Sequence, residues 1–120
     1  MKTARDPRHQ NRRRIVQELY SYSVNHQSTL NVNLLKPIIN QLGNLDSQIV
    51  KCAPERPLND INKIDLAILR LGIYEILSNK AIPISVIIDE AVELAKEFGS
   101  EGSPSFVNAV LAKITNAKIN

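Results

Sequence analysis

The sequence contains one cysteine, Cys52, and no tryptophan in its 120 residues. A single cysteine excludes an internal disulfide and any metal site built from several thiolates. It is also a poor candidate for a nucleophile, because the two possible bases, His9 and His26, both lie in polar stretches. Cys52 is therefore expected to be a small, buried apolar residue. The chain also has no glycine-rich cofactor loop, which together with the setting of Cys52 argues against an enzyme, and no cofactor or metal is expected.

Long apolar runs are also absent. No stretch is long enough to span a bilayer and no secretory signal follows the N-terminus, so a cytoplasmic location is expected. Aromatic residues make up only 4% of a chain that is 43% hydrophobic. The core is therefore expected to consist of leucine, isoleucine, valine and alanine. A length of 120 residues suits one such core in one domain.

The most apolar stretch, Ile61 to Leu77, predicts a helix at the centre of the fold. Its apolar residues form two stripes at helical spacing, on different sides of the helix. The stripes consist of Ile61, Ile64, Ile68 and Leu71, and of Leu66, Leu69, Ile73 and Ile76. A helix that is apolar on nearly all sides is one that other elements surround. Gly72, in the middle of the stretch, indicates that a neighbouring helix packs closely there.

After Lys63 near its start, three charged residues interrupt this stretch, namely Asp65, Arg70 and Glu75. None of them has an opposite charge three or four positions away in the same helix. An unpaired buried charge is very costly, so each must find a tertiary partner, reach solvent or meet a ligand. The sequence leaves these three possibilities open.

The rest of the chain indicates further helices and no strand. They are expected at about residues 11–25, 32–42, 45–52, 85–98 and from Ser103-Pro104 onward. The predicted fold class is therefore all-α, a compact bundle of about six helices around the central apolar helix. Residues 11–120 are expected to form this single domain.

Two details of this layout concern polar residues. Asn59 or Asp60 is expected to cap the central helix at its N-terminus. Glu90, Glu93 and Glu97 are expected to form a solvated outer face of the 85–98 helix.

Positive charge is concentrated at the start of the chain. Residues 1–14 carry six basic residues and one acidic residue, a net charge of +5, whereas the remainder carries −2. Residues 1–10 are expected to form a flexible basic arm, because Pro7 breaks any earlier helix. Arginines at a helix start oppose the helix dipole, so Arg12 and its two neighbours favour a negatively charged ligand such as nucleic acid. A solvated tail without a ligand is the other interpretation.

Two long motifs resemble the NusB family. They are IDLAILRLGIYEIL in the central helix and IPISVIIDEAVELAKEFGSEGSPSFVNAVL after it. A shorter pattern, Arg12 followed by Gln17-Glu18-Leu19-Tyr20, is similar to the family's first-helix motif. The chain departs from the family in being shorter after the first helix. It also has Gly102 where an acidic residue is common, and Pro104-Ser105 where polar or basic residues are common.

The resemblance implies an all-helical protein without catalytic activity that acts in transcription antitermination. Such a protein binds the single-stranded boxA element of nascent RNA together with the small-subunit ribosomal protein NusE. That complex joins a larger assembly on RNA polymerase, and no membrane or cofactor is involved.

The resemblance and the physics of RNA binding together suggest a set of RNA contacts. Single-stranded RNA is held by neutralising its phosphates and by stacking its bases on aromatic or guanidinium planes. The expected contacts are arginines, the loop before the last helix, and the two phenylalanines that flank this loop. In full, they are Arg8, Arg12, Arg13, Arg14, Arg70, Phe98, Ser100, Gly102 and Phe106. Core packing is the other interpretation for the two phenylalanines.

A partner-binding surface is expected at Tyr20, Val24, Ile64 and Asp65, where a carboxylate without a local partner stands beside apolar residues. These positions match the place where the family meets its ribosomal protein. Two alternatives to an RNA-binding factor are open. One is a helical protein-interaction module that has lost RNA binding. The other is a fragment of an enzyme, since NusB-like domains also occur fused to RNA methyltransferases.

Overall fold

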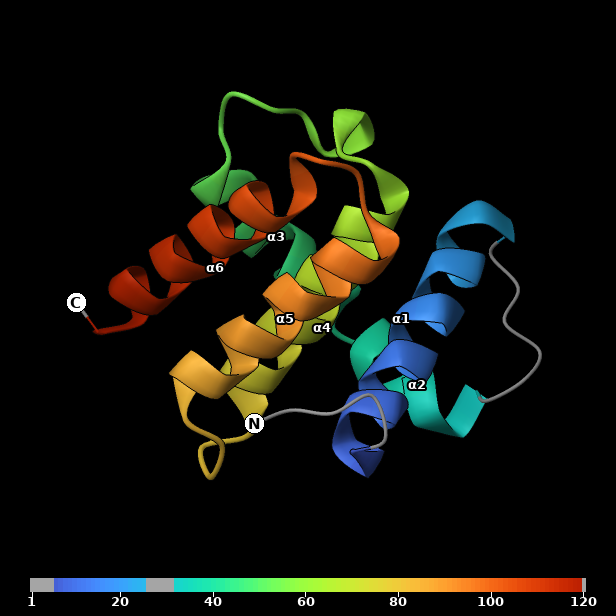
Figure 1. Cartoon of the computed structure of the whole chain (residues 1–120). Coiled ribbons are helices and arrows are strands. Elements are labelled where there is room, and N and C mark those ends of the chain that lie inside the picture. Colours follow the sequence, from blue (N-terminus) through green and yellow to red (C-terminus); the bar gives the residue numbers. More distant parts are fainter. Residues whose placement is uncertain (1–5, 26–31, 120) are drawn as a thin grey trace.

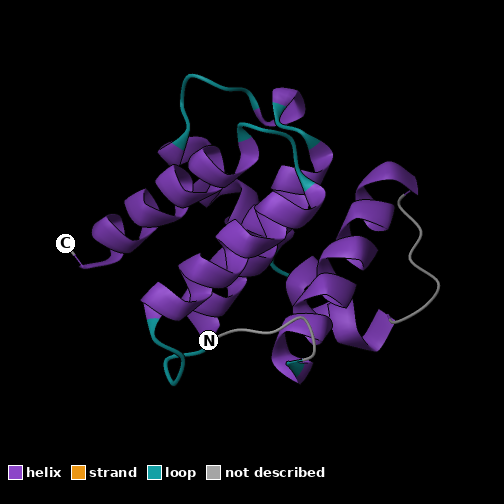
Figure 2. Ribbon diagram, in the orientation of Figure 1, coloured by secondary structure: helices purple, strands orange, loops and turns teal. Residues whose placement is uncertain are grey.

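The computed structural model describes residues 6–25 and 32–119, which form helices joined by loops (Figure 1). Six α-helices and one 3-10 helix follow one another within these ranges. They are α1 (Pro7–Asn25), α2 (Val32–Ile39), α3 (Leu42–Cys52), η1 (Leu58–Asp60), α4 (Lys63–Ser78), α5 (Ile84–Phe98) and α6 (Ser103–Ile119). Figure 2 shows no strand in the described part of the chain. The predicted all-α class with about six helices is confirmed.

Helix α4 is the centre of the bundle, as the sequence predicts. Helices α1, α3, α5 and α6 all pack against it. Ten of its sixteen residues are buried, and Ile68 and Leu69 are essentially inaccessible to solvent. The close helix approach expected at Gly72 is also present. A Cβ placed on this glycine would lie 3.1 Å from the Cδ1 atom of Leu111 in α6.

Helix α1 begins at Pro7, so the expected flexible arm is wrong for residues 7–10, which form its first turn. The cause is an Asp-Pro start signal, in which the Asp6 carboxylate accepts a 2.9 Å hydrogen bond from the amide of Arg8. Hydrogen bonds from the Arg8 side chain and amide lower the pKa of Asp6 from 3.8 to about 2. Since the folded-state pKa is the lower one, this stabilisation is present above about pH 4 and is lost as the pH falls toward 2. Residues 1–5 lie outside the described residues.

Other helix boundaries differ from the expected ones. Helix α2 ends at Ile39, and a turn at residues 40–41 leads into α3, which begins three residues earlier than expected. The cap of α4 is Asn62, whose side-chain oxygen accepts a 2.8 Å hydrogen bond from the Ile64 amide. The prediction of a cap at residue 59 or 60 is wrong, because these residues belong to η1.

The expected solvated face of α5 is wrong for Glu90, which is buried. Its Oε2 atom lies 2.9 Å from Nδ1 of His9, so the pair ties the first turn of α1 to the middle of α5. Glu93 and Glu97 do lie at the surface. The side chain of Cys52 is buried, as expected, and burial raises the pKa of its thiol.

Among the described residues, no helix has the length and apolar character needed to cross a membrane. They also contain no group of three or more histidine, cysteine, aspartate and glutamate side chains arranged to hold a metal ion.

Candidate nucleic-acid interface

The loop between α5 and α6, residues 99–102, is held tightly at both ends. The backbone amide of Ser100 donates a 2.9 Å hydrogen bond to the Ser103 hydroxyl. Gly99 is required by this close packing, because a Cβ there would overlap the Ser103 side chain and lie 2.8 Å from the carbonyl oxygen of Ala95. Ser100 and Gly102 are exposed, and a Cβ on Gly102 would meet no atom within 4 Å. The loop therefore presents a fixed backbone to solvent.

A phenylalanine stands on each side of this loop, and each ring is covered by an arginine. Phe98 ends α5, and the guanidinium carbon of Arg13 lies 5.4 Å from its ring centroid. Phe106 lies in the first turn of α6, and the guanidinium carbon of Arg56 lies 4.2 Å from its centroid. Both rings are half-buried and pack against the hydrophobic core. The two interpretations of the phenylalanines are therefore compatible, since each ring has one side in the core and one under a guanidinium.

Arg13 is the arginine of α1 that reaches this loop region. Its Nε atom donates a 2.6 Å hydrogen bond to Glu97 and its Nη1 atom donates one of 3.0 Å to Gln10. About a third of its side chain is exposed. The charge of Arg13 is thus partly balanced by Glu97, yet both groups remain accessible to a ligand.

Arg8 and Arg14 lie at the surface of α1. Arg8 pairs with Asp6 at 3.0 Å, but 83% of its side chain is exposed, so solvent screens this pair strongly. Arg14 has no ion pair or side-chain hydrogen bond with any described residue. Arg13 and Arg14 line one shallow surface groove of about 460 Å³, together with Pro7 and three polar, uncharged residues of α1.

Arg12 and Arg70 lie apart from this surface and are only 8% exposed. The guanidinium of Arg12 donates to both carboxylate oxygens of Glu75 in α4, with its shortest hydrogen bond at 2.8 Å. This pairing raises the pKa of Arg12. Arg70 donates to both oxygens of Asp46 in α3 at 2.9 Å. Carboxylates of the chain occupy hydrogen-bonding edges of both arginines, so neither is proposed below as a phosphate contact.

The expected partner surface has two exposed residues and one buried carboxylate. Tyr20 and Val24 are 42% and 47% exposed and lie one turn apart on α1. Ile64 is half-buried at the start of α4. Asp65 is only 3% exposed, and its Oδ1 atom has no hydrogen-bond partner among the described residues. Of the three charges that interrupt the apolar stretch, Arg70 and Glu75 have tertiary partners, whereas Asp65 keeps one oxygen unsatisfied by the described residues.

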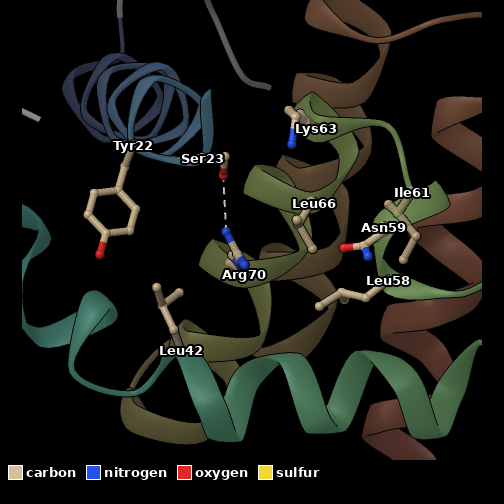
Figure 3. Close-up of a pocket in the computed structure, with 9 residues that line it drawn as sticks. All are labelled: Tyr22, Ser23, Leu42, Leu58, Asn59, Ile61, Lys63, Leu66 and Arg70. Atoms are coloured by element: carbon tan, nitrogen blue, oxygen red, sulfur yellow. Dashed lines mark hydrogen bonds between the residues drawn. The ribbon is translucent and has the colours of Figure 1, made fainter. Parts of the chain in front are cut away.

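A pocket of about 410 Å³ opens between α1, η1 and the start of α4 (Figure 3). It is lined by Tyr22, Ser23, Leu42, Leu58, Asn59, Ile61, Lys63, Leu66 and Arg70. Figure 3 shows the hydrogen bond from Arg70 to the Ser23 hydroxyl, 3.1 Å long, at one wall of the pocket. Arg70, which lines this pocket, is also held in place by its ion pair with Asp46.

Sequence reasoning missed Arg56 as the residue that covers the Phe106 ring. It lies in the linker between α3 and η1, fifty residues before Phe106, and no spacing rule connects the two. The sequence offers only a weak indication that Arg56 has a special position. It lies in a proline-containing, exposed segment, whereas most of the other arginines lie in α1.

The fold and this surface define a class of protein, namely a small helical bundle with exposed arginines and arginine-covered aromatic rings around one loop. The chain belongs to the NusB family, whose model matches residues 2–116.

Similar proteins agree with this assignment. The transcription antitermination protein NusB of Aliarcobacter butzleri is 41% identical over 93 residues, which is 78% of this chain and 70% of that protein. The protein of the same name from Campylobacter jejuni (strain RM1221) is 32% identical and covers 92% of this chain and 97% of its own length. A solved structure of T. maritima NusB superposes with a TM-score of 0.84 at 31% identity, covering 97% of this chain and 93% of that chain.

Proposed function

We propose that this protein is a non-catalytic, RNA-binding transcription antitermination factor that works in the cytoplasm. It binds single-stranded, boxA-type RNA together with the ribosomal protein NusE, and the complex joins a larger assembly on RNA polymerase. The observation that carries the proposal is the arrangement around the α5–α6 loop. Two half-buried phenyl rings, each covered by a guanidinium, flank an exposed loop, and Arg13 joins this loop region to α1. Membership in the NusB family supports the same role.

These groups suit the two requirements of single-stranded RNA. Arg8, Arg13 and Arg14 supply positive charge at the surface of α1 for phosphates. The guanidinium planes that cover the two rings supply surfaces on which unpaired bases stack. The open space around Gly102 lets an RNA backbone approach the loop closely.

Replacing Arg13 and Arg14 together by alanine should weaken binding to boxA-type RNA and to unrelated single strands alike. Each phosphate contact with a single strand contributes about 0.7 to the slope of log affinity against log salt concentration. We therefore expect the slope to flatten by up to about 1.4 units. Fluorescence anisotropy titrations at several salt concentrations measure it, and an unchanged slope would show that these arginines do not contact phosphates.

Two further variants sharpen this measurement. Lys80→Ala removes an exposed cation from the loop before α5, at the opposite end of this helix from residues 99–102, and should leave the slope unchanged. Glu97→Gln removes the carboxylate that partly balances Arg13 and should raise RNA affinity. A loss of affinity in Glu97→Gln would contradict a phosphate-binding role for Arg13.

The surface of Tyr20, Val24, Ile64 and Asp65 is our proposed contact for NusE. Two adjacent exposed apolar side chains on one helix face favour a protein partner. The unsatisfied Oδ1 atom of Asp65 favours one that brings a hydrogen-bond donor to the edge of this surface, since a buried carboxylate oxygen without a donor is costly.

Val24→Asp should lower the affinity for NusE at least tenfold, because it places a charge in the centre of this apolar contact. Val86→Asp is the matched control, since Val86 is also an exposed valine on a helix, in the first turn of α5. Isothermal titration calorimetry with purified NusE measures both. Equal affinities for the two variants would place the partner surface elsewhere.

A second candidate function is a helical protein-interaction module without RNA binding. The pocket of Figure 3 and the exposed Tyr20 and Val24 favour it, because they offer a hollow and an apolar surface on which a protein can dock. The same two titrations separate the candidates. Binding of NusE without measurable binding of any single-stranded RNA would select the interaction module.

A further inference from the structure

Arg56 differs from most of the arginines in its surroundings. The guanidinium groups of Arg8, Arg12, Arg13 and Arg70 are all hydrogen-bonded to carboxylates of this chain. Arg56 is exposed, and its side chain has no ion pair or hydrogen bond with any described residue. Its one specific contact is the ring of Phe106, 4.2 Å from the guanidinium carbon to the centroid. Arg56 therefore carries an unbalanced charge in a defined position.

The position of Arg56 is set by local backbone structure. Pro54 and Pro57 restrict the linker on either side, and the Arg56 amide donates a 3.1 Å hydrogen bond to the carbonyl oxygen of Ala53. Phe106 is anchored in turn, since it packs against the core. Figure 1 shows the linker before η1 and the α5–α6 loop at the same end of the bundle. The guanidinium thus rests on a rigid support beside the proposed RNA site.

A guanidinium that lies over a phenyl ring has one face covered and one face toward solvent. The open face is planar and delocalised, and it stacks on nucleobases as well as on aromatic rings. Its N–H groups around the edge remain available for phosphate or base oxygens. A lysine at the same place would keep the charge but would offer no plane.

We propose that Arg56 is a base-stacking residue of the RNA site, and that one unpaired base forms the top layer of a base–guanidinium–phenyl stack on Phe106. This inference rests on the proposed function and extends it to a residue outside α1 and outside the α5–α6 loop. The ligand is an unpaired base within a single strand. Because the phenyl ring is already in place, the stack forms without rearranging the core.

The test compares Arg56→Lys and Arg56→Ala in anisotropy titrations with a boxA-type RNA. Loss of one stacked base corresponds to about 1–3 kcal/mol, or about 5–140-fold in affinity at 1.4 kcal/mol per tenfold. Both variants should weaken binding within this range, and Arg56→Lys should do so with an unchanged salt slope. If Arg56→Lys binds like the wild type while Arg56→Ala loses about 0.7 units of slope, Arg56 is a phosphate contact and the stack is wrong.

A scan with abasic sites identifies the stacked base directly. Each RNA in the series lacks one base but keeps its phosphates. At one position, removal of the base should weaken the wild type but cause little further loss in Arg56→Ala, because both changes remove the same contact. Additive losses at every position would overturn the proposal. Phe106→Leu serves as a second variant, and it should reduce the coupling at the same position.

The outcomes separate this inference from the function on which it rests. A wild-type protein that binds no single-stranded RNA, alone or with NusE, would overturn both. A wild type that binds RNA and depends on Arg13 and Arg14, with no effect of either Arg56 variant, would overturn the stack alone. Circular dichroism confirms that each variant is folded, which we expect because Arg56 is exposed.

Discussion

Leu69→Ala should lower the free energy of unfolding by about 2–5 kcal/mol, because the change leaves a cavity in a core that cannot collapse fully. Leu69 is completely buried at the middle of α4, against which α1, α3, α5 and α6 all pack. Its full burial means that the truncated side chain would leave a space inside the core. Urea unfolding followed by circular dichroism measures the change, and the loss should appear as a lower midpoint with an unchanged slope.

The control for this prediction is on the same helix. Leu77→Ala makes the same chemical change at a half-buried position near the end of α4. It should cost less, since part of the leucine already meets solvent and less apolar surface is lost from the core. A cost below about 1 kcal/mol for both Leu69→Ala and Ile68→Ala would mean that α4 is not the packing centre.

The identity of the central helix could be predicted because its signal is redundant. Two apolar stripes at helical spacing leave the helix almost no polar side. Such a helix is stable in water only when other helices surround it. Gly72 added a local signal of close packing, which Leu111 of α6 accounts for. Such features depend on residues near one another in the sequence, so composition and spacing are enough to predict them.

Helix ends were harder to predict because several residues compete for each cap. Asn59, Asp60 and Asn62 are all good capping residues, and only the backbone path through η1 selects Asn62. Pro7 was interpreted as a helix breaker, although a proline after an aspartate also suits the first turn of a helix. The choice between these interpretations depends on whether the following residues find packing partners.

The partners of buried charges could not be predicted from local patterns. Arg12 and Glu75 are 63 residues apart, and His9 and Glu90 are 81 apart. The sequence indicates that an unpaired charge in an apolar helix needs a partner, but many residues could supply it. Arg12 and Arg70 are therefore among the RNA contacts expected from the sequence. Sequence patterns do not distinguish arginines that bind RNA from arginines that form buried ion pairs.

Arg12→Ala should separate these two uses of arginine, and it is expected to cost about 3 kcal/mol of folding free energy. Removing one partner of a buried ion pair costs about 3–5 kcal/mol, because the remaining charge stays desolvated. We expect the lower end, since 15% of the Glu75 side chain is still exposed. Thermal or urea unfolding measures the loss, and Arg14→Ala is the control, because this neighbour is exposed and has no described ion pair to break.

The double variant Arg12→Met with Glu75→Leu then decides whether Arg12 has a second role. Replacing both members of a buried pair by apolar residues of similar size is often neutral or stabilising, so stability should recover. If Arg12 acts only within the fold, the recovered protein should bind RNA with the wild-type salt slope. A folded double variant whose slope is flatter by about 0.7 units would show instead that Arg12 reaches a phosphate, and that its pairing with Glu75 gives way when RNA binds.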